Sequence, residues 1–257
     1  MTTLLQAEGV SKAFGGVQAL SGCTVEVEQG SITGLIGPNG SGKTTLFNVM
    51  TGYERVDAGE VRFDGRKITN MPPDRVFGLG VGRTFQLTRI FPRLTVLENM
   101  LVATHRGHRV RNPLARMGGP AERRRAADLL EFTGIAGHAA ALADTLSYGQ
   151  RKLLELACLL VADPAVMLLD EPAGGVNPSL INEIAARIRE LNAKGTTFLI
   201  VEHNMEFVMS LCDRVTVLDY GNVIASGSPE IIRSDARVLD AYLGGSVEED
   251  EDVAPAE

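Results

Sequence analysis

The chain has 257 residues, of which 44% are hydrophobic, and a formal net charge of −7; a chain of this length can bury about three quarters of its unfolded surface in one domain. Its three cysteines are far apart and odd in number, which excludes a disulfide-stapled fold and favours buried thiols in a reducing compartment. No apolar run approaches the roughly 18 residues that a membrane span needs, and the N-terminus has no signal-peptide core. We therefore expect a soluble protein that stays where it is made.

The negative charge is concentrated at the C-terminus. Six of the last ten residues are acidic: Glu248, Glu249, Asp250, Glu251, Asp252 and Glu257. Subtracting them leaves a net charge of −1 for the rest of the chain. Such runs are typical of solvated segments, so we expect one domain over residues 1–245 and a disordered acidic tail over 246–257.

The first part of the chain reads as short strands. Residues 4–10, 24–28 and 61–68 are β-like, the last with an Asp64-Gly65 turn. The apolar run 32–36 then leads directly into a glycine-rich loop.

That loop, GPNGSGKTT, fits the pattern Gly-x-x-x-x-Gly-Lys-Thr at every fixed position, and residues 43–50 are predicted to form the helix after it. Backbone N–H groups of a glycine-rich turn and the positive end of the following helix make an anion site. A nucleoside triphosphate is therefore expected to contact Gly37, Pro38, Asn39, Gly40, Ser41, Gly42, Lys43, Thr44 and Thr45. Lys43 should reach the β- and γ-phosphates, Thr44 should give its hydroxyl to Mg²⁺, and Thr45 should touch the α-phosphate.

The middle of the chain changes character. Residues 71–143 have a mostly helical pattern with arginine-rich, Pro/Gly-broken connectors, including a long loop at 105–120 and a helix at 121–132. After Ser147, apolar residues recur at helical spacing and predict a further helix. We expect nothing functional of His105, His108 and His138.

The last part alternates between strands and helices. Strands are predicted at 166–169, 197–201, 215–218 and 223–225; helices are predicted around Ile181–Leu191 and at 205–212. Alternating elements of this kind predict an α/β fold with a mostly parallel sheet covered on both faces.

Asp170 and Glu171 follow the apolar strand at 166–169. The carboxyl edge of a parallel sheet is where α/β proteins bind ligands. Asp170 is therefore a candidate ligand of Mg²⁺, which prefers oxygen donors. Glu171 is the candidate that deprotonates or polarises the attacking water.

Taken together, these motifs resemble the ATP-binding subunit of an ABC transporter over residues 4–243, because they occur in the order of that family. Phe14 resembles the aromatic residue that stacks on adenine, and Gln86 resembles the glutamine that contacts Mg²⁺ and water. The sequence LSYGQ at Leu146–Gln150 resembles the family's LSGGQ signature. His203 resembles the histidine that contacts the γ-phosphate.

The resemblance implies a P-loop NTPase of the ABC ATPase fold, with a mostly parallel sheet core, an antiparallel β subdomain and a helical subdomain over approximately 87–165. It implies ATP and Mg²⁺ as cofactors, and Lys43, Gln86, Glu171 and His203 as catalytic residues. It also implies that Ser147, Gly149 and Gln150 complete the nucleotide site of a second ATPase subunit. Two protomers would then enclose two ATP molecules in a ligand-controlled switch.

Two departures from the family pattern are informative. Tyr148 replaces the first glycine of LSGGQ, and Asn177 stands where many relatives have Asp, so a charge-based role at that position is in doubt. Both variants, with the run GRTFQLTRIFPRLTVLENMLVA and the ending LDAYLGG, resemble the ATPase subunits of branched-chain amino acid importers.

This resemblance implies an ATPase at the inner face of the cell membrane, attached through two permease subunits and served by an extracytoplasmic solute-binding protein. Gln86 and residues 87–98 would form the surface that faces the permease. A urea or short-amide importer and a lipopolysaccharide-export ATPase remain alternatives within the class. A soluble ABC ATPase of translation or DNA repair is disfavoured, because the chain has one cassette and no concentrated basic face for nucleic acid beyond Arg106 to Arg116 and Arg123 to Arg125. An ATP-binding module without turnover is disfavoured by the intact set of catalytic residues. The transported substrate, the direction of transport and the identity of the second ATPase subunit stay open.

Overall fold

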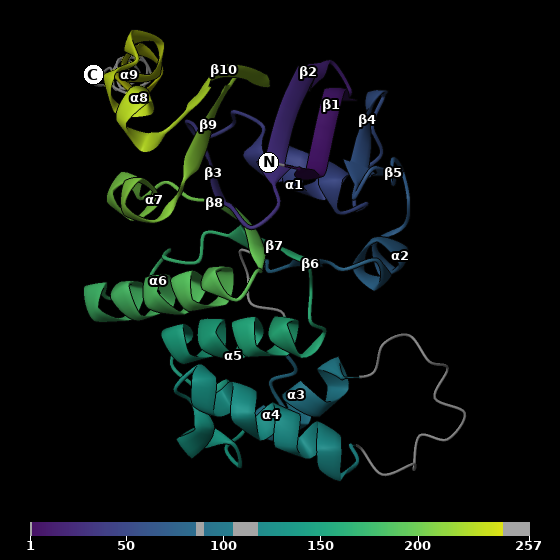
Figure 1. Ribbon diagram of the computed structural model, residues 1–257, viewed down its shortest axis with the longest axis vertical. Helices are drawn as coiled ribbons and strands as arrows, with labels where there is room; N and C mark the ends of the chain where they lie inside the picture. Colours follow the sequence, from purple (N-terminus) through teal and green to yellow (C-terminus); the bar gives the residue numbers. More distant parts are fainter. Residues whose placement is uncertain (1, 86–89, 105–117, 244–257) are drawn as a thin grey trace, which may run out of the picture.

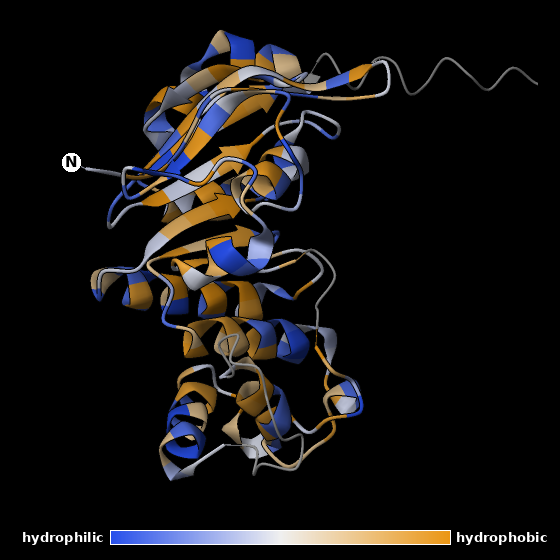
Figure 2. Cartoon of the chain, turned by 90° about the vertical axis from the view of Figure 1, so that its right-hand side faces the viewer, coloured by the Kyte–Doolittle hydropathy of each residue, from blue (hydrophilic) through white to orange (hydrophobic). Residues whose placement is uncertain are grey.

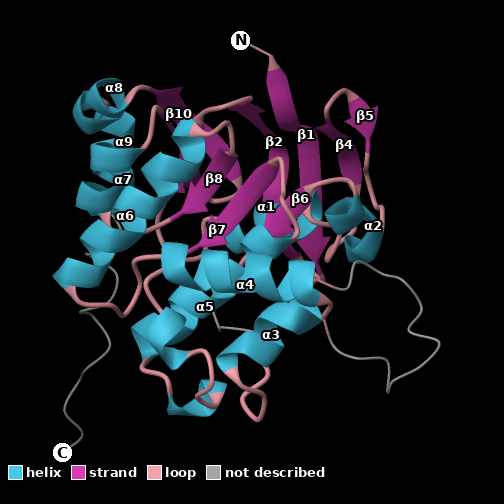
Figure 3. Ribbon diagram, turned by 60° about the horizontal axis from the view of Figure 1, so that its bottom comes forward, coloured by secondary structure: helices cyan, strands magenta, loops and turns pink. Residues whose placement is uncertain are grey.

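The computed structural model describes residues 2–85, 90–104 and 118–243. Its strands form two sheets (Figures 1 and 3). The antiparallel sheet has the order β2-β1-β4-β5. In that order its strands span Val17–Glu28, Thr3–Phe14, Ala58–Phe63 and Arg66–Lys67. Asp64 and Gly65, with φ of 49° and 70°, make the expected tight turn between β4 and β5.

The second sheet has six strands in the order β10-β9-β3-β8-β7-β6. In that order its strands span Asn222–Gly227, Arg214–Asp219, Ile32–Ile36, Thr197–Val201, Val166–Asp170 and Val81–Arg83. All neighbours are parallel except β9 and β10, which are joined by a turn at Tyr220-Gly221. The prediction of a mostly parallel core with an antiparallel β subdomain is confirmed.

The helices follow the strands in sequence. They are α1 (Lys43–Met50), α2 (Pro73–Gly78), α3 (Val96–Ala103), α4 (Pro120–Phe132), α5 (Tyr148–Val161), α6 (Pro178–Ala193), α7 (Met205–Leu211), α8 (Pro229–Ser234) and α9 (Ala236–Leu243), with 3₁₀ turns at Ala136–His138 and Ala143–Thr145. No described helix combines the length and the apolar character needed to span a membrane. The strand β6 interrupts the stretch that we expected to be mostly helical.

Two hydrophobic clusters cover the two faces of the six-stranded sheet. In β7, Met167 and Leu169 face one cluster, and Val166 and Leu168 face the other, as the two-residue period of a strand requires. The second cluster contains the buried residues of α1 and of the antiparallel sheet, so α1 is packed between the sheets. In Figure 2 the apolar strands accordingly lie inside the molecule.

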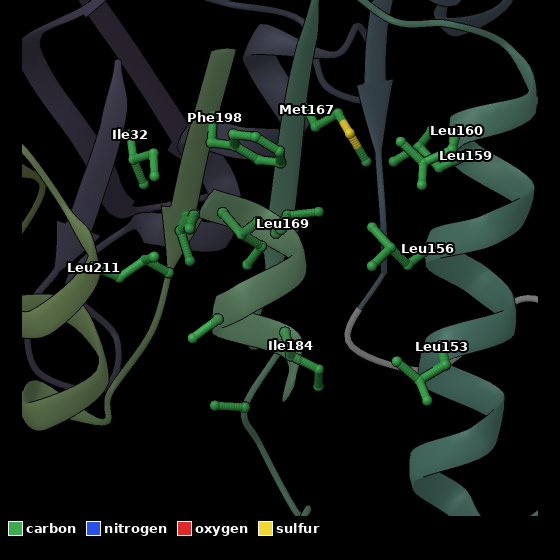
Figure 4. Packing of buried hydrophobic residues seen from close by; sticks show 14 of the residues in the cluster. Ile32, Leu153, Leu156, Leu159, Leu160, Met167, Leu169, Ile184, Phe198 and Leu211 are labelled. Carbon is green, nitrogen blue, oxygen red and sulfur yellow. The ribbon is translucent and has the colours of Figure 1, made fainter. Parts of the chain in front are cut away.

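The first cluster lies between the six-stranded sheet and the helices on the face opposite α1. Leu153 and Leu156 of α5 point toward β7 (Figure 4), which explains the helical spacing of apolar residues after Ser147. The helices α3 and α4 pack on α5 on the side away from the sheet. We propose approximately 87–165 as the bounds of a helical subdomain built on these three helices.

The three cysteines are free, as expected. Cys23 and Cys212 are buried, and Cys158 is partly buried.

Candidate functional site

Four strand ends meet at one edge of the parallel sheet. The strands β3, β8, β7 and β6 are consecutive neighbours and run in the same direction. Their carboxyl ends therefore bring together Gly37, Glu202, Asp170 and Arg83, although these residues are far apart in the sequence. This edge is the candidate functional site, at the place where α/β proteins bind ligands.

The phosphate loop has no room for side chains at its two fixed glycines. Gly37 has φ of 151°, and a Cβ atom there would lie 2.0 Å from the carbonyl oxygen of Leu218. Gly42 has φ of 103°, and its Cβ would lie 2.5 Å from the carbonyl oxygen of Ala19. The glycines of the motif are thus required by the chain packed behind the loop as well as by its backbone angles.

Lys43 bends back over the loop. Its Nζ donates to the carbonyl oxygens of Gly37 and Pro38, at 2.8 and 2.7 Å. Burial lowers the pKa of Lys43, and the negative charges of Glu171 and Asp170 oppose this shift. The charges of both acids thus act on Lys43 across the site.

The other loop residues differ in exposure. Asn39, Gly40 and Thr44 are exposed, whereas Ser41 is buried and its carbonyl oxygen accepts a hydrogen bond from the N–H of Gly221 at 3.0 Å. Thr45 is half-buried.

Asp170 ends β7 and is 4% exposed. Its Oδ2 accepts a hydrogen bond from Nη2 of Arg83 at 3.1 Å, and its N–H donates to Oγ1 of Thr84 at 3.0 Å. Burial raises the pKa of Asp170, and the guanidinium of Arg83 opposes that shift. The carboxylate of Asp170 and the exposed hydroxyl of Thr44 are oxygen donors of the kind that Mg²⁺ binds, so the residues present fit this ion.

Glu171 has an unusual backbone. Its φ is 48°, in the left-handed region, and its N–H donates to the carbonyl oxygen of Val201 at 2.9 Å. Strained backbone of this kind concentrates at functional sites. Its Oε1 lies 3.8 Å from Nδ1 of His203, which is 64% exposed. Lys152 donates to the carbonyl oxygen of Glu171, which fixes the start of α5 against this residue.

Glu202 joins the segments that carry these two residues. Its fully buried carboxylate accepts hydrogen bonds from the N–H groups of Ala173 at 2.6 Å, His203 at 3.2 Å and Asn204 at 3.4 Å. Burial raises the pKa of Glu202, and the three backbone donors oppose the shift. Glu202 thus holds the loop after Glu171 against the loop of His203.

Ser147 is the N-cap of α5. Its Oγ accepts from the N–H of Gln150 at 3.2 Å, and its N–H donates to Oε1 of Gln150 at 2.9 Å, a capping box. Nε2 of Gln150 also lies 3.0 Å from Nε2 of His138. A Cβ at the buried Gly149 would lie 2.1 Å from Cδ2 of Leu180, so this glycine permits the close approach of α6.

The two departures from the family pattern have structural reasons. The ring of Tyr148 lies over Gly175, where a Cβ would be 3.1 Å from Cε1 of Tyr148. The Nζ of Lys152 lies 5.4 Å from the same ring centroid, a cation–π contact. Asn177 is the N-cap of α6, and its Oδ1 accepts from the N–H of Leu180 at 2.9 Å. The amide of Asn177 therefore performs a structural task that needs no charge.

Phe14 stands at the end of β1 with 45% of its surface exposed, and Nζ of Lys12 lies 5.0 Å from its ring centroid. The exposed ring of Phe14 is available for stacking; its contact with adenine stays a prediction. Gln86 lies outside the described residues, as do 87–89 of the expected permease-facing segment and the acidic tail.

Three charged residues of the site were not among those predicted: Arg83, Lys152 and Glu202. Each is a single charged residue next to a motif: Arg83 within GRTFQ, Lys152 two residues after LSYGQ and Glu202 before His203. For Glu202 the available signal was a charged residue directly after the predicted strand at 197–201. For Arg83 no strand was predicted. For Lys152 the sequence offers no such signal.

The family model for ABC transporters matches residues 20–174, and a model described as branched-chain amino acid ATP-binding cassette transporter matches residues 222–248. The chain is 40% identical over 250 residues to the high-affinity branched-chain amino acid transport ATP-binding protein BraF of Pseudomonas aeruginosa. This alignment covers 94% of the present chain and 98% of BraF. The chain is 39% identical over 249 residues to the corresponding protein LivG of Escherichia coli K12, with the same two coverages.

Solved structures show the same fold. A nucleotide-free ATP-binding cassette of an ABC transporter superposes with a TM-score of 0.82 at 34% identity, covering 94% of this chain and 99% of the other. A cassette in its ADP conformation also superposes with a TM-score of 0.82 at 34% identity, covering 95% of this chain and 100% of the other. A bacterial ABC transporter cassette described as dimeric superposes with a TM-score of 0.77 at 26% identity, covering 88% of this chain and 99% of the other.

Proposed function

Because this chain belongs to the ABC transporter family as one of its ATP-hydrolysing subunits, we propose that it powers a branched-chain amino acid importer. The observation that carries the proposal is the 40% identity to BraF, which extends over 98% of that protein. The match of residues 222–248 to a branched-chain amino acid cassette model also supports it, because those residues follow the shared ATPase motifs.

In this proposal each residue of the site has one task. Lys43 and the N–H groups of the phosphate loop hold the phosphates, and Phe14 stacks on the adenine. Glu171 accepts a proton from the attacking water, and His203, whose Nδ1 lies 3.8 Å from Oε1 of Glu171, contacts the γ-phosphate. Thr44, Asp170 and Gln86 would hold Mg²⁺ when it is bound, and the ion would supply positive charge that stabilises the negative charge developing during phosphoryl transfer.

The site of one chain is completed by another in this proposal. The N-terminus of α5, with Ser147 and Gly149, presents the positive end of the helix dipole to the γ-phosphate bound by a second ATPase subunit. Hydrolysis removes that contact and opens the pair. Two permease subunits, contacted through Gln86 and the segment after it, hold the ATPases at the inner face of the cell membrane, and an extracytoplasmic binding protein delivers the amino acid.

Co-purification followed by transport measurements tests the proposal. The chain, expressed with its neighbouring permease and binding-protein genes and reconstituted in proteoliposomes, should drive ATP-dependent uptake of leucine, isoleucine or valine. ATP hydrolysis with uptake of urea or short amides instead would overturn the substrate assignment and favour that importer. A stable association with ribosomes or DNA without a permease would overturn the transport function itself.

A further inference from the structure

Arg83 is a buried cation to which the mechanism above assigns no task. It ends β6, and only 5% of its side chain is exposed. Its Nη1 donates to Oδ1 of Asn48 at 2.7 Å and to Oγ1 of Thr51 at 3.2 Å, while its Nη2 donates to Oδ2 of Asp170 at 3.1 Å. One guanidinium therefore connects the end of the phosphate-loop helix with the carboxylate at the end of β7.

Three aromatic rings surround the same group. The Arg83 Cζ atom lies 5.0 Å from the ring centroid of Phe85, 5.6 Å from that of Phe47 and 5.7 Å from that of Tyr53. The rings of Tyr53 and Phe85 meet edge to face, with centroids 5.4 Å apart. These contacts restrict the guanidinium plane, because cation–π attraction depends on the position of the charge over each ring.

A buried ion pair is weak evidence for a role in stability, because well-packed apolar residues often stabilise a core as well or better. The pair at Arg83 has a second property. It orients the one carboxylate at the site that is a candidate Mg²⁺ ligand, and partners that orient metal ligands typically change metal affinity or activity by about 10- to 100-fold when they are replaced.

We propose that Arg83 is a positioning residue that holds the Asp170 carboxylate in the orientation that Mg²⁺–nucleotide requires and ties that orientation to α1 through Asn48 and Thr51. The proposal rests on the proposed function, in which Asp170 is a Mg²⁺ ligand. Lysine cannot replace arginine here. Its ammonium is a point charge without the planar fork that contacts Asn48 and Asp170 together.

The test is a Mg²⁺ titration of Arg83→Lys, which keeps the positive charge. The thermal midpoint is measured with saturating ADP at increasing Mg²⁺, and once in EDTA. Arg83→Lys should need about tenfold more Mg²⁺ than wild type for half of the Mg²⁺-dependent rise, and its ATPase should show the same shift. The control Arg62→Lys replaces a 41% exposed arginine paired with Glu60 and should leave the Mg²⁺ midpoint unchanged.

If Arg83→Lys lowers the melting temperature in EDTA and leaves the Mg²⁺ midpoint unchanged, Arg83 is structural and the proposal is wrong. A lower Mg²⁺ requirement would also overturn it, since the guanidinium would then compete with the ion. If Arg83→Lys does not fold, Asn48→Ala removes one acceptor of Arg83 and should raise the Mg²⁺ midpoint several-fold; no change there overturns the proposal as well. A wild-type protein without any Mg²⁺ response would instead contradict the proposed function.

Discussion

The Nδ1 atom of His203 lies 3.8 Å from Oε1 of Glu171, although the two residues follow different strands. The adjacency of β7 and β8 brings these strand ends together, and the buried carboxylate of Glu202 fixes the two loops by accepting N–H groups from both.

Glu171→Gln should bind ATP normally and hydrolyse it at least about 100-fold more slowly, because an amide cannot accept the proton of the attacking water. The variant should accumulate as an ATP-bound dimer, detectable by gel filtration with ATP. Phosphate release at the wild-type rate would show that another group acts as the base.

Glu202→Gln should change the pH dependence of stability. Burial raises the pKa of Glu202, so the folded protein binds the carboxyl proton of Glu202 more tightly than the unfolded chain does. The stability that this proton contributes is fully present below the unfolded pKa of about 4.3. It is lost as pH rises through the folded pKa. Urea unfolding of both proteins between pH 4 and pH 7 should show wild type losing stability relative to Glu202→Gln as pH rises; a constant difference would contradict the raised pKa.

Gly175→Ala should destabilise the protein by about 1–2 kcal/mol, because Gly175 has φ of 69° and alanine pays roughly that amount in the left-handed region. A second contribution comes from the new Cβ, which would lie 3.1 Å from the ring of Tyr148. Adding Tyr148→Ala should relieve only this second contribution. A double-mutant cycle in urea measures it, and strictly additive effects would show that the ring yields without strain.

Asn177→Ala should lower stability by about 1 kcal/mol, the usual loss when a helix loses its N-cap. Asn177→Asp keeps the acceptor and adds a negative charge at the N-terminus of α6, where it is favourable. We therefore expect Asn177→Asp to be at least as stable as wild type in thermal unfolding. A loss as large as that of the alanine variant would mean that the side-chain acceptor of Asn177 is not what stabilises α6.

The three cysteines should be inert in the folded protein. Burial raises the pKa of Cys23, Cys158 and Cys212 to about 12 each, so at pH 8 roughly one thiol in 10⁴ is ionised, against about a quarter of free cysteine at its usual pKa. Titration with a thiol-specific disulfide reagent should detect all three thiols in denaturant and react slowly without it. Rapid reaction of the folded protein would show that one of them is accessible.

The sequence predicted the parts of the site that form continuous motifs. The phosphate loop lies between a strand and a helix as expected, and Asp170 ends a buried strand. Both features depend on residues that are neighbours in the chain. The roles that we propose for the individual residues await the experiments above.

Other features depend on neighbours in space and were not predictable. Arg83 ends a strand of three residues, which is too short to show a period, and its partners Asn48 and Asp170 lie in distant segments. The position of Glu202 after a strand was visible in the sequence, but its role could be recognised only once the N–H of Ala173 was known to lie beside it. The helices α8 and α9 follow a hairpin for which only the two strands were expected.

The phosphate loop lies near the N-terminus of the chain, whereas several residues that pack against it lie near the C-terminus. Its strand β3 pairs only with β8 and β9 among the described strands, and the loop itself rests against Leu218 and Gly221. Because synthesis proceeds from the N-terminus, we expect the nucleotide site to form only after β9 and Gly221 have been made. A ribosome-bound chain that stops before β9 should therefore fail to retain ATP, even though every residue of its phosphate loop is already present.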